Sequence, residues 1–231
     1  MNSLYSILLL SSIAVPLALS FDKKLRFYKQ WKYLFPSIIV VAILYIAVDV
    51  WFTKIGVWGF NNRYYSQNTL FGLPVEEWLF FMAIPYASIF LHDSIVLYFN
   101  KFRIKQKSAN VLSVFLLVLS VLLLLFNFDK AYTVYMLTTT IAVLILSFFD
   151  SSETTSRFYL TFLIILLPFI AVNAILTGSF IAEPVVWYNN GENLGIRFLT
   201  IPIEDFGYAF SLILFILLFR NKLKTWFDKS L

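Results

Sequence analysis

The chain has 231 residues, of which 60% are hydrophobic and 19% aromatic, while only 13% are charged. This composition excludes an ordinary soluble domain with a solvated surface and predicts an all-α integral membrane protein. The chain has no Cys, which excludes disulfides and thiolate chemistry.

Seven apolar stretches are long enough to cross a bilayer as helices. The first has no basic residue ahead of its apolar run, so we expect a retained helix and not a signal peptide. The stretches cover about residues 3–20, 33–52, 74–99, 110–127, 131–149, 158–177 and 202–219.

Lys and Arg gather in alternate connections, and this asymmetry sets the orientation of the spans through the positive-inside rule. Four basic residues lie on one side, namely Lys54, Arg63, Lys130 and Arg197, and the other 14 of the 18 lie on the opposite side. We therefore predict a multi-pass protein of the cell membrane, with the N-terminus outside and the C-terminus in the cytoplasm. The net charge of +5 is a signal of topology, and no nucleic-acid partner is expected.

The sequence contains an internal repeat. PVEEWLFF at residues 74–81 matches PIEDFGYAF at residues 202–210, and the match extends upstream. Phe60-Asn61-Asn62 matches Tyr188-Asn189-Asn190, and Ile46-Ala47-Val48-Asp49 matches Ile170-Ala171-Val172-Asn173. We predict tandem parallel three-helix repeats over residues 1–100 and 130–231, joined by a connector span over 101–129. Sites in such repeat proteins tend to lie between the halves.

Each repeated motif places two adjacent acids at the start of a long apolar run. Pro precedes each pair by two positions, so the acids fall in the first helical turn, near the positive end of the helix dipole. One acid would suffice to cap a helix. Like charges and desolvation both disfavour ionisation of neighbouring carboxyls, so one member is expected to retain a proton and act as a general acid. The candidate catalytic residues are Glu76, Glu77, Glu204 and Asp205.

Helical spacing indicates which acid of each pair faces the bundle. Glu204 shares a face with Gly207 and Tyr208, and Glu76 lies over Ala83 and Ala87. Small and polar residues line helix interfaces in membranes, so we predict Glu76 and Glu204 as the inward acids.

Other residues at the same level are candidates for support. Asp49 and its counterpart Asn173 end spans there and are expected to orient or share the proton, or else to contact lipid headgroups. Aromatic rings could stabilise a carbocation through their faces, or form an interfacial belt. These rings are Trp58, Trp78, Trp187 and Tyr208. His92 and Asp93 lie farther along their span, and we expect them to pair with the basic loop at residues 101–107.

Several kinds of site have no support. There is no GxGxxG after a strand and no Walker A loop, which disfavours nucleotide and flavin sites. No His or Cys cluster has metal-ligand spacing. The seventh span has no Lys for a retinal Schiff base, and there is no Asp-rich stretch to hold magnesium diphosphates. We expect redox-neutral chemistry without a cofactor or metal.

Two Pro-x-Glu-(Glu/Asp) motifs that open spans in two tandem three-span halves resemble the lycopene cyclases of the small integral-membrane type. That family occurs as two separate subunits in some bacteria, as a single fused chain, and as the cyclase part of fungal fusions with phytoene synthase. The resemblance covers essentially the whole chain, which is similar to the fused form. In one departure, the second motif has Gly207 and Tyr208 where the first has Leu79 and Phe80.

The resemblance implies an isomerase-type lycopene cyclase that takes a linear carotenoid from the bilayer. A carboxylic acid protonates the terminal double bond, the adjacent double bond closes on the cation, and loss of a proton gives the ring. Glu76 and Glu204 are then the proton donors, with Glu77 and Asp205 tuning them or taking the proton back. Membrane lipid surrounds the protein, and both a homo-oligomer and association with other carotenoid enzymes stay open.

Two other functions are compatible with part of the pattern. A hydratase would form the same carotenoid cation and admit water to it. A small membrane transporter would also suit a parallel repeat with membrane acids, although it predicts acids near the middle of the spans.

Overall fold

The computed structural model describes residues 3–229. This part of the chain contains seven α-helices. The first two residues of the predicted first repeat and the last two of the second lie outside it. The helices follow the order of the seven apolar stretches, which confirms the all-α prediction. They are α1 (Leu4–Leu19), α2 (Trp31–Ile55), α3 (Val75–Tyr98), α4 (Gln106–Phe126), α5 (Ala131–Ser147), α6 (Thr154–Leu176) and α7 (Ile203–Lys229).

Local sequence signals explain the helix boundaries that matter for the site. A 3₁₀ turn over Phe27–Gln30 leads into α2, which ends at Ile55 and is followed by the capping residue Gly56. The φ of +78° at Gly56 is the left-handed conformation that terminates helices. Pro74 and Pro202 end short strands directly before α3 and α7. The acidic pairs therefore fall in the first turns of these helices, as predicted.

Four of the described helices are long and apolar enough to cross a membrane. They are the helical segment Phe27–Ile55 and the helices Val75–Tyr98, Gln106–Phe126 and Thr154–Leu176. Leu4–Leu19 and Ala131–Ser147 are apolar but shorter.

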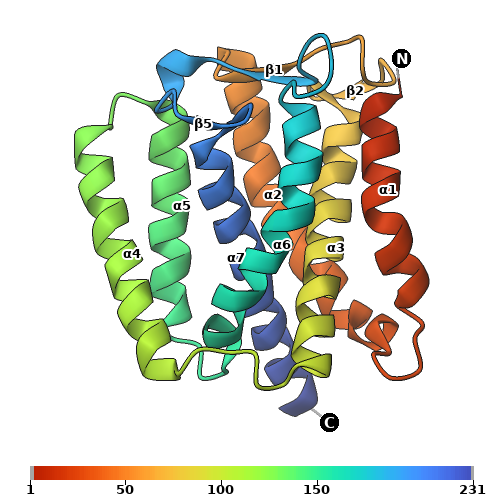
Figure 1. The fold of residues 1–231 in the computed structure, drawn as a ribbon, viewed down its shortest axis with the longest axis vertical. Coiled ribbons are helices and arrows are strands. Elements are labelled where there is room, and N and C mark those ends of the chain that lie inside the picture. The colour runs from red at the N-terminus through yellow and green to blue at the C-terminus, as the bar shows by residue number, and fades with distance from the viewer. Residues whose placement is uncertain (1–2, 230–231) are drawn as a thin grey trace.

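The helices form a bundle in which α3 and α7 take central places (Figure 1). α1 packs against α3, and α5 packs against α7 in the same way. α2 and α6 each contact both central helices. α4 lies at one edge of the bundle, where it contacts α5 and α6. The residues that α3 and α7 carry are thereby shielded by neighbours on several sides.

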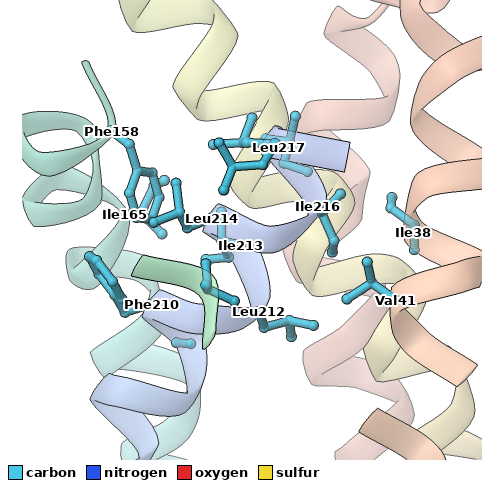
Figure 2. Packing of buried hydrophobic residues seen from close by; sticks show 14 of the residues in the cluster. Ile38, Val41, Phe158, Ile165, Phe210, Leu212, Ile213, Leu214, Ile216 and Leu217 are labelled. Carbon is cyan, nitrogen blue, oxygen red and sulfur yellow. The ribbon is translucent and has the colours of Figure 1, made fainter. Parts of the chain in front are cut away.

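The apolar core is built around α7. Figure 2 shows Phe210 and Leu214 pointing toward α6, while Ile216 points toward Ile38 and Val41 of α2. Most of the apolar side chains of α7 between Phe210 and Leu218 are buried in these contacts. The core therefore fixes α7, and with it the acids of its first turn, between α2 and α6.

Short antiparallel strands cover the end of the bundle at which α1 begins (Figure 1). β1 (Trp58–Phe60) pairs with β4 (Val186–Tyr188), β2 (Thr69–Leu70) with β3 (Leu73–Pro74), and β5 (Arg197–Phe198) with β6 (Ile201–Pro202). The β1–β4 pair joins the loop between α2 and α3 to the loop between α6 and α7, with Gly59 opposite Trp187 at its centre. A Cβ at Gly59 would collide with the Trp187 indole, so only Gly permits this close approach.

His92 and Asp93 do not pair with the basic loop, so that prediction is wrong. The Arg220 guanidinium of α7 binds both carboxylate oxygens of Asp93, at 2.6 and 2.9 Å. His92 is buried, and its Nδ1 lies 2.7 Å from the Thr161 hydroxyl of α6. The bidentate pair joins α3 to α7, for which the planar guanidinium is well suited, and the His92 contact joins α3 to α6.

Candidate active site

All four predicted acids are buried. The exposed fraction is 2% for Glu76, 8% for Glu77, 0% for Glu204 and 5% for Asp205. Burial of a carboxyl is costly unless hydrogen bonds or a retained proton compensate it. The partners of each acid therefore indicate what the acid does.

Glu76 connects the loop between α2 and α3 to two helices. Its Oε1 accepts a hydrogen bond from the Ser6 hydroxyl of α1 and another from the backbone N–H of Ser66, each at 2.9 Å. Its Oε2 is buried and has no hydrogen-bond partner among the described residues. The carboxyl thus holds the loop against the start of α3.

Glu204 makes the matching contacts in the second half. Its Oε1 accepts hydrogen bonds from the Thr133 hydroxyl of α5 at 2.8 Å and from the backbone N–H of Leu194 at 2.7 Å. Its Oε2 is also buried without a described partner. Glu76 and Glu204 form what we call the loop-binding acids.

The other two acids line a cavity that β1 and β4 help to enclose. Glu77 of α3 and Asp205 of α7 both face it, together with Asp49 near the end of α2. We call these three the cavity acids. The cavity walls come from α1, α2, α3, α5, α6 and α7 and from strands β1 and β4. Residues from both predicted halves therefore surround one shared space.

Glu77 and Asp205 differ in the number of phenols that they bind. The Tyr5 hydroxyl of α1 donates to Oε2 of Glu77. The Tyr132 hydroxyl of α5 donates to Oδ1 of Asp205, and the Tyr188 hydroxyl of β4 donates to Oδ2 at 3.2 Å. Both oxygens of Asp205 are thus engaged, whereas Oε1 of Glu77 has no hydrogen bond to a described residue.

Tyr188 lies on a strand outside the helices. Burial raises the pKa of its phenol well above the ordinary value, and the nearby Asp205 charge raises it further. The hydroxyl therefore stays protonated and can keep donating to Asp205.

Asp49 is 3% exposed, and only one of its carboxylate oxygens accepts hydrogen bonds from described residues. Its Oδ1 accepts hydrogen bonds from the Trp58 indole N–H at 2.6 Å and from the Thr53 hydroxyl at 3.4 Å. The counterpart Asn173 also lines the cavity, but its amide donates to the Phe169 carbonyl of its own helix. The two halves are therefore not equivalent at this position.

Aromatic rings make up much of the cavity wall. Trp58, Tyr132 and Tyr208 lie next to the cavity acids, and their ring centroids are 5.0 Å apart for Trp58 and Tyr132 and 6.3 Å for Tyr132 and Tyr208. The negative faces of such rings attract a cation. An apolar space with few carboxyls and many rings suits a hydrocarbon that passes through a carbocation.

Comparison with known protein families matches the lycopene cyclase family over residues 2–95 and 129–223. The chain belongs to the lycopene cyclase family. The matched regions contain all three cavity acids and both loop-binding acids. Comparisons with curated proteins and with solved structures gave no match.

Family membership makes the chain a carotenoid cyclase, and therefore an enzyme. With the four long apolar helices, it also indicates association with a membrane.

In this cyclase all four acids are buried, but only one acid of each pair lines the cavity. Glu76 and Glu204, predicted to face the bundle, are buried against α1 and α5, but the residues that line the cavity are Glu77 and Asp205. The reason is visible at Gly207, where a Cβ would collide with the Met136 side chain of α5. The small residue serves close packing between α7 and α5, so it does not mark the cavity.

The predicted supporting residues are divided between the cavity and the surface. Trp58, Tyr208, Asp49 and Asn173 line the cavity. Trp78 instead donates its indole N–H to the Leu70 carbonyl at 3.2 Å. Trp187 is 43% exposed and covers Gly59. Neither of these two Trp residues is among those that line the cavity.

Sequence reasoning missed Tyr5 and Tyr132, the phenols that bind the cavity acids. A signal was present, because Tyr5-Ser6 and Tyr132-Thr133 stand at matching places in the two halves. In each pair the Tyr binds a cavity acid and the next hydroxyl binds a loop-binding acid.

Proposed function

We propose that this cyclase converts lycopene, a linear carotenoid, to a cyclic carotene by redox-neutral acid catalysis. A proton adds to the terminal double bond, the adjacent double bond closes on the cation, and a proton is lost. The observation that carries this proposal is the cavity in which Glu77, Asp205 and Asp49 face aromatic walls.

Glu77 is the proposed proton donor. Its Oε2 accepts a hydrogen bond from the Tyr5 hydroxyl, and its Oε1 has no partner among the described residues. A proton on Oε1 can therefore face a double bond in the cavity. A general acid must lie within reach of the atom that it protonates. The assignment of this role to Glu76 and Glu204 from the sequence is less well supported, because neither lines the cavity.

Asp205 is proposed to stabilise the cation. Two phenols donate to its two oxygens, an arrangement that favours a fixed carboxylate. Its negative charge and the faces of Trp58 and Tyr208 would then stabilise positive charge as the ring closes. Burial excludes bulk water, which would otherwise capture the cation.

The loop-binding acids, Glu76 and Glu204, are proposed to be positioning residues. Each binds the backbone of an outer loop and a hydroxyl on a neighbouring helix. By fixing the loops over the cavity they would keep it closed to water.

We further propose seven membrane spans in two parallel repeats over residues 1–100 and 130–231, with residues 101–129 as the connector. The similar pairing of α1 with α3 and of α5 with α7 supports the repeat, as does the antiparallel β1–β4 pair. The outer side of α4 is apolar and exposed, as a lipid-facing helix requires. Its exposed residues include Val111, Val114, Phe115, Val118 and Leu122.

The positive-inside rule then gives the proposed orientation in the cell membrane, with the N-terminus outside and the C-terminus cytoplasmic. The substrate would enter from the bilayer. The cavity acids would act near the outer side.

The test is pigment chromatography of lycopene-accumulating cells that express the chain. We expect monocyclic or bicyclic carotene, and none in cells with the empty vector. Unchanged lycopene in the presence of membrane-inserted protein would contradict the proposal, and hydroxylated open-chain products would indicate a hydratase instead.

A further inference from the structure

The acid-catalysed cycle needs a second group besides the donor. After ring closure the cation loses a proton, and a base must receive it. Glu77, having just donated, is one candidate, but it must then act from the same place at both steps. The cavity holds two other carboxyls, Asp205 and Asp49.

The hydrogen bonds distinguish these two. Both oxygens of Asp205 accept hydrogen bonds from phenol hydroxyls. Asp49 receives both of its hydrogen bonds on Oδ1, so Oδ2 has no described partner. Among the three cavity acids, Glu77 and Asp49 each keep one oxygen free of hydrogen bonds.

Asp49 also lies near the donor. Both carboxyls line the same cavity, and the charge of Asp49 acts on Glu77 more strongly than the charge of Asp205 does. A proton taken up at Asp49 can therefore return to Glu77 within the cavity, which restores the donor for the next turnover.

We infer that Asp49 is the catalytic base, which takes the proton from the ring cation on Oδ2. This inference rests on the proposed function. Atoms and electrons balance in three steps. Glu77 gives one proton to the terminal double bond, and a carbon–carbon bond then closes the ring. Finally one C–H bond breaks, its electron pair forms the ring double bond, and its proton passes to Asp49. No oxidant, reductant or cofactor takes part.

A structural role for Asp49 must be separated from this chemical one, because Asp49 also anchors Trp58 of β1. Asp49→Asn separates them. The amide oxygen can still accept the Trp58 indole N–H, but the side chain no longer takes a proton at neutral pH. The counterpart Asn173 shows that an amide is accommodated at the matching place in the other half.

The experiment compares wild-type, Asp49→Asn and Trp58→Phe proteins in membranes in deuterated water, with lycopene as substrate. Products are separated by chromatography, and deuterium is measured by mass spectrometry. Trp58→Phe removes the indole donor but leaves the Asp49 carboxyl in place. Its rate should fall because the cavity loses part of a ring face, but the cation should still lose its proton to Asp49 and give the wild-type ring.

For Asp49→Asn we expect at least a tenfold loss of the wild-type cyclic product, with the cation diverted to hydroxylated ends or another ring isomer. If conversion stops, recovered lycopene should carry deuterium at the protonated carbon, since reversible protonation continues. Wild-type product composition, or a complete stop with no deuterium in the recovered substrate, would overturn the role of Asp49. Failure of the wild-type protein to make any cyclic product would instead overturn the proposed function.

Discussion

Glu77 on α3 and Asp205 on α7 stand at matching positions in the two halves, yet their surroundings differ. Asp205 accepts hydrogen bonds from two phenols, whereas Glu77 accepts one. The sequence match pairs Tyr188, the extra donor, with Phe60, which lines the same cavity without a hydroxyl. A duplicated carboxyl can therefore acquire a separate role through a change in one neighbour.

The same comparison extends to the ends of α2 and α6. The first half has Asp49 and the second has Asn173, and both line the cavity. The first half thus supplies two carboxyls to the cavity and the second supplies one. In our account the first half carries the proton transfers and the second half carries the fixed charge.

Removal of the proposed proton donor should have the largest effect on turnover. Glu77→Gln keeps the shape and the Tyr5 contact but carries no transferable proton. We expect turnover to fall by about 10³- to 10⁴-fold, the upper part of the range for a general acid. The rate of carotene formation in isolated membranes, at matched protein level, measures this. A rate within tenfold of wild type would exclude Glu77 as the donor.

Asp205→Asn is expected to have the next largest effect. The amide retains the volume and one acceptor but removes the negative charge that we propose stabilises the cation. Loss of one preorganised electrostatic group costs about 10²-fold in rate. Single-turnover kinetics should show slower ring closure, while an unchanged rate would mean that Asp205 is structural.

Removal of the extra phenol tests the difference between the halves directly. Tyr188→Phe makes the surroundings of Asp205 resemble those of Glu77. A hydrogen bond to a charged group is worth about 1.5 to 3 kcal/mol, which corresponds to about 10- to 150-fold in rate. The Tyr188 bond is long at 3.2 Å, so we expect a loss near the lower end, about tenfold. Tyr65→Phe is the matched control, because it removes a loop hydroxyl outside the site and should leave the rate unchanged. Equal rates in the two variants would argue against a role for the second phenol.

The loop-binding acids should give the smallest effect on turnover. Gln retains the Oε1 acceptor, so Glu76→Gln should keep more than about a tenth of the wild-type rate. Glu76→Ala removes the acceptor of two hydrogen bonds and should cost about 1 to 3 kcal/mol of stability. Thermal unfolding in detergent compares the two variants. A Glu76→Gln protein that is folded but inactive would restore Glu76 as a donor.

The sequence was sufficient to predict the seven helices and the first-turn position of both acidic pairs, because long apolar runs and Pro-x-Glu starts are local signals. The direction of each acid was not predictable in this way. Gly207 suggested an inward face for Glu204, but its small size is needed for contact with Met136. The partner of Asp93 was also out of reach, since Arg220 lies 127 residues away in the chain.

Product spectra of the Glu77→Gln and Asp205→Asn variants decide whether the two halves form one shared cavity. A shared cavity predicts that each single substitution reduces monocyclic and bicyclic carotene together. Two independent sites, one in each half, would leave each variant able to close rings at the intact site. Near-normal ring closure by both single variants would therefore contradict a shared cavity.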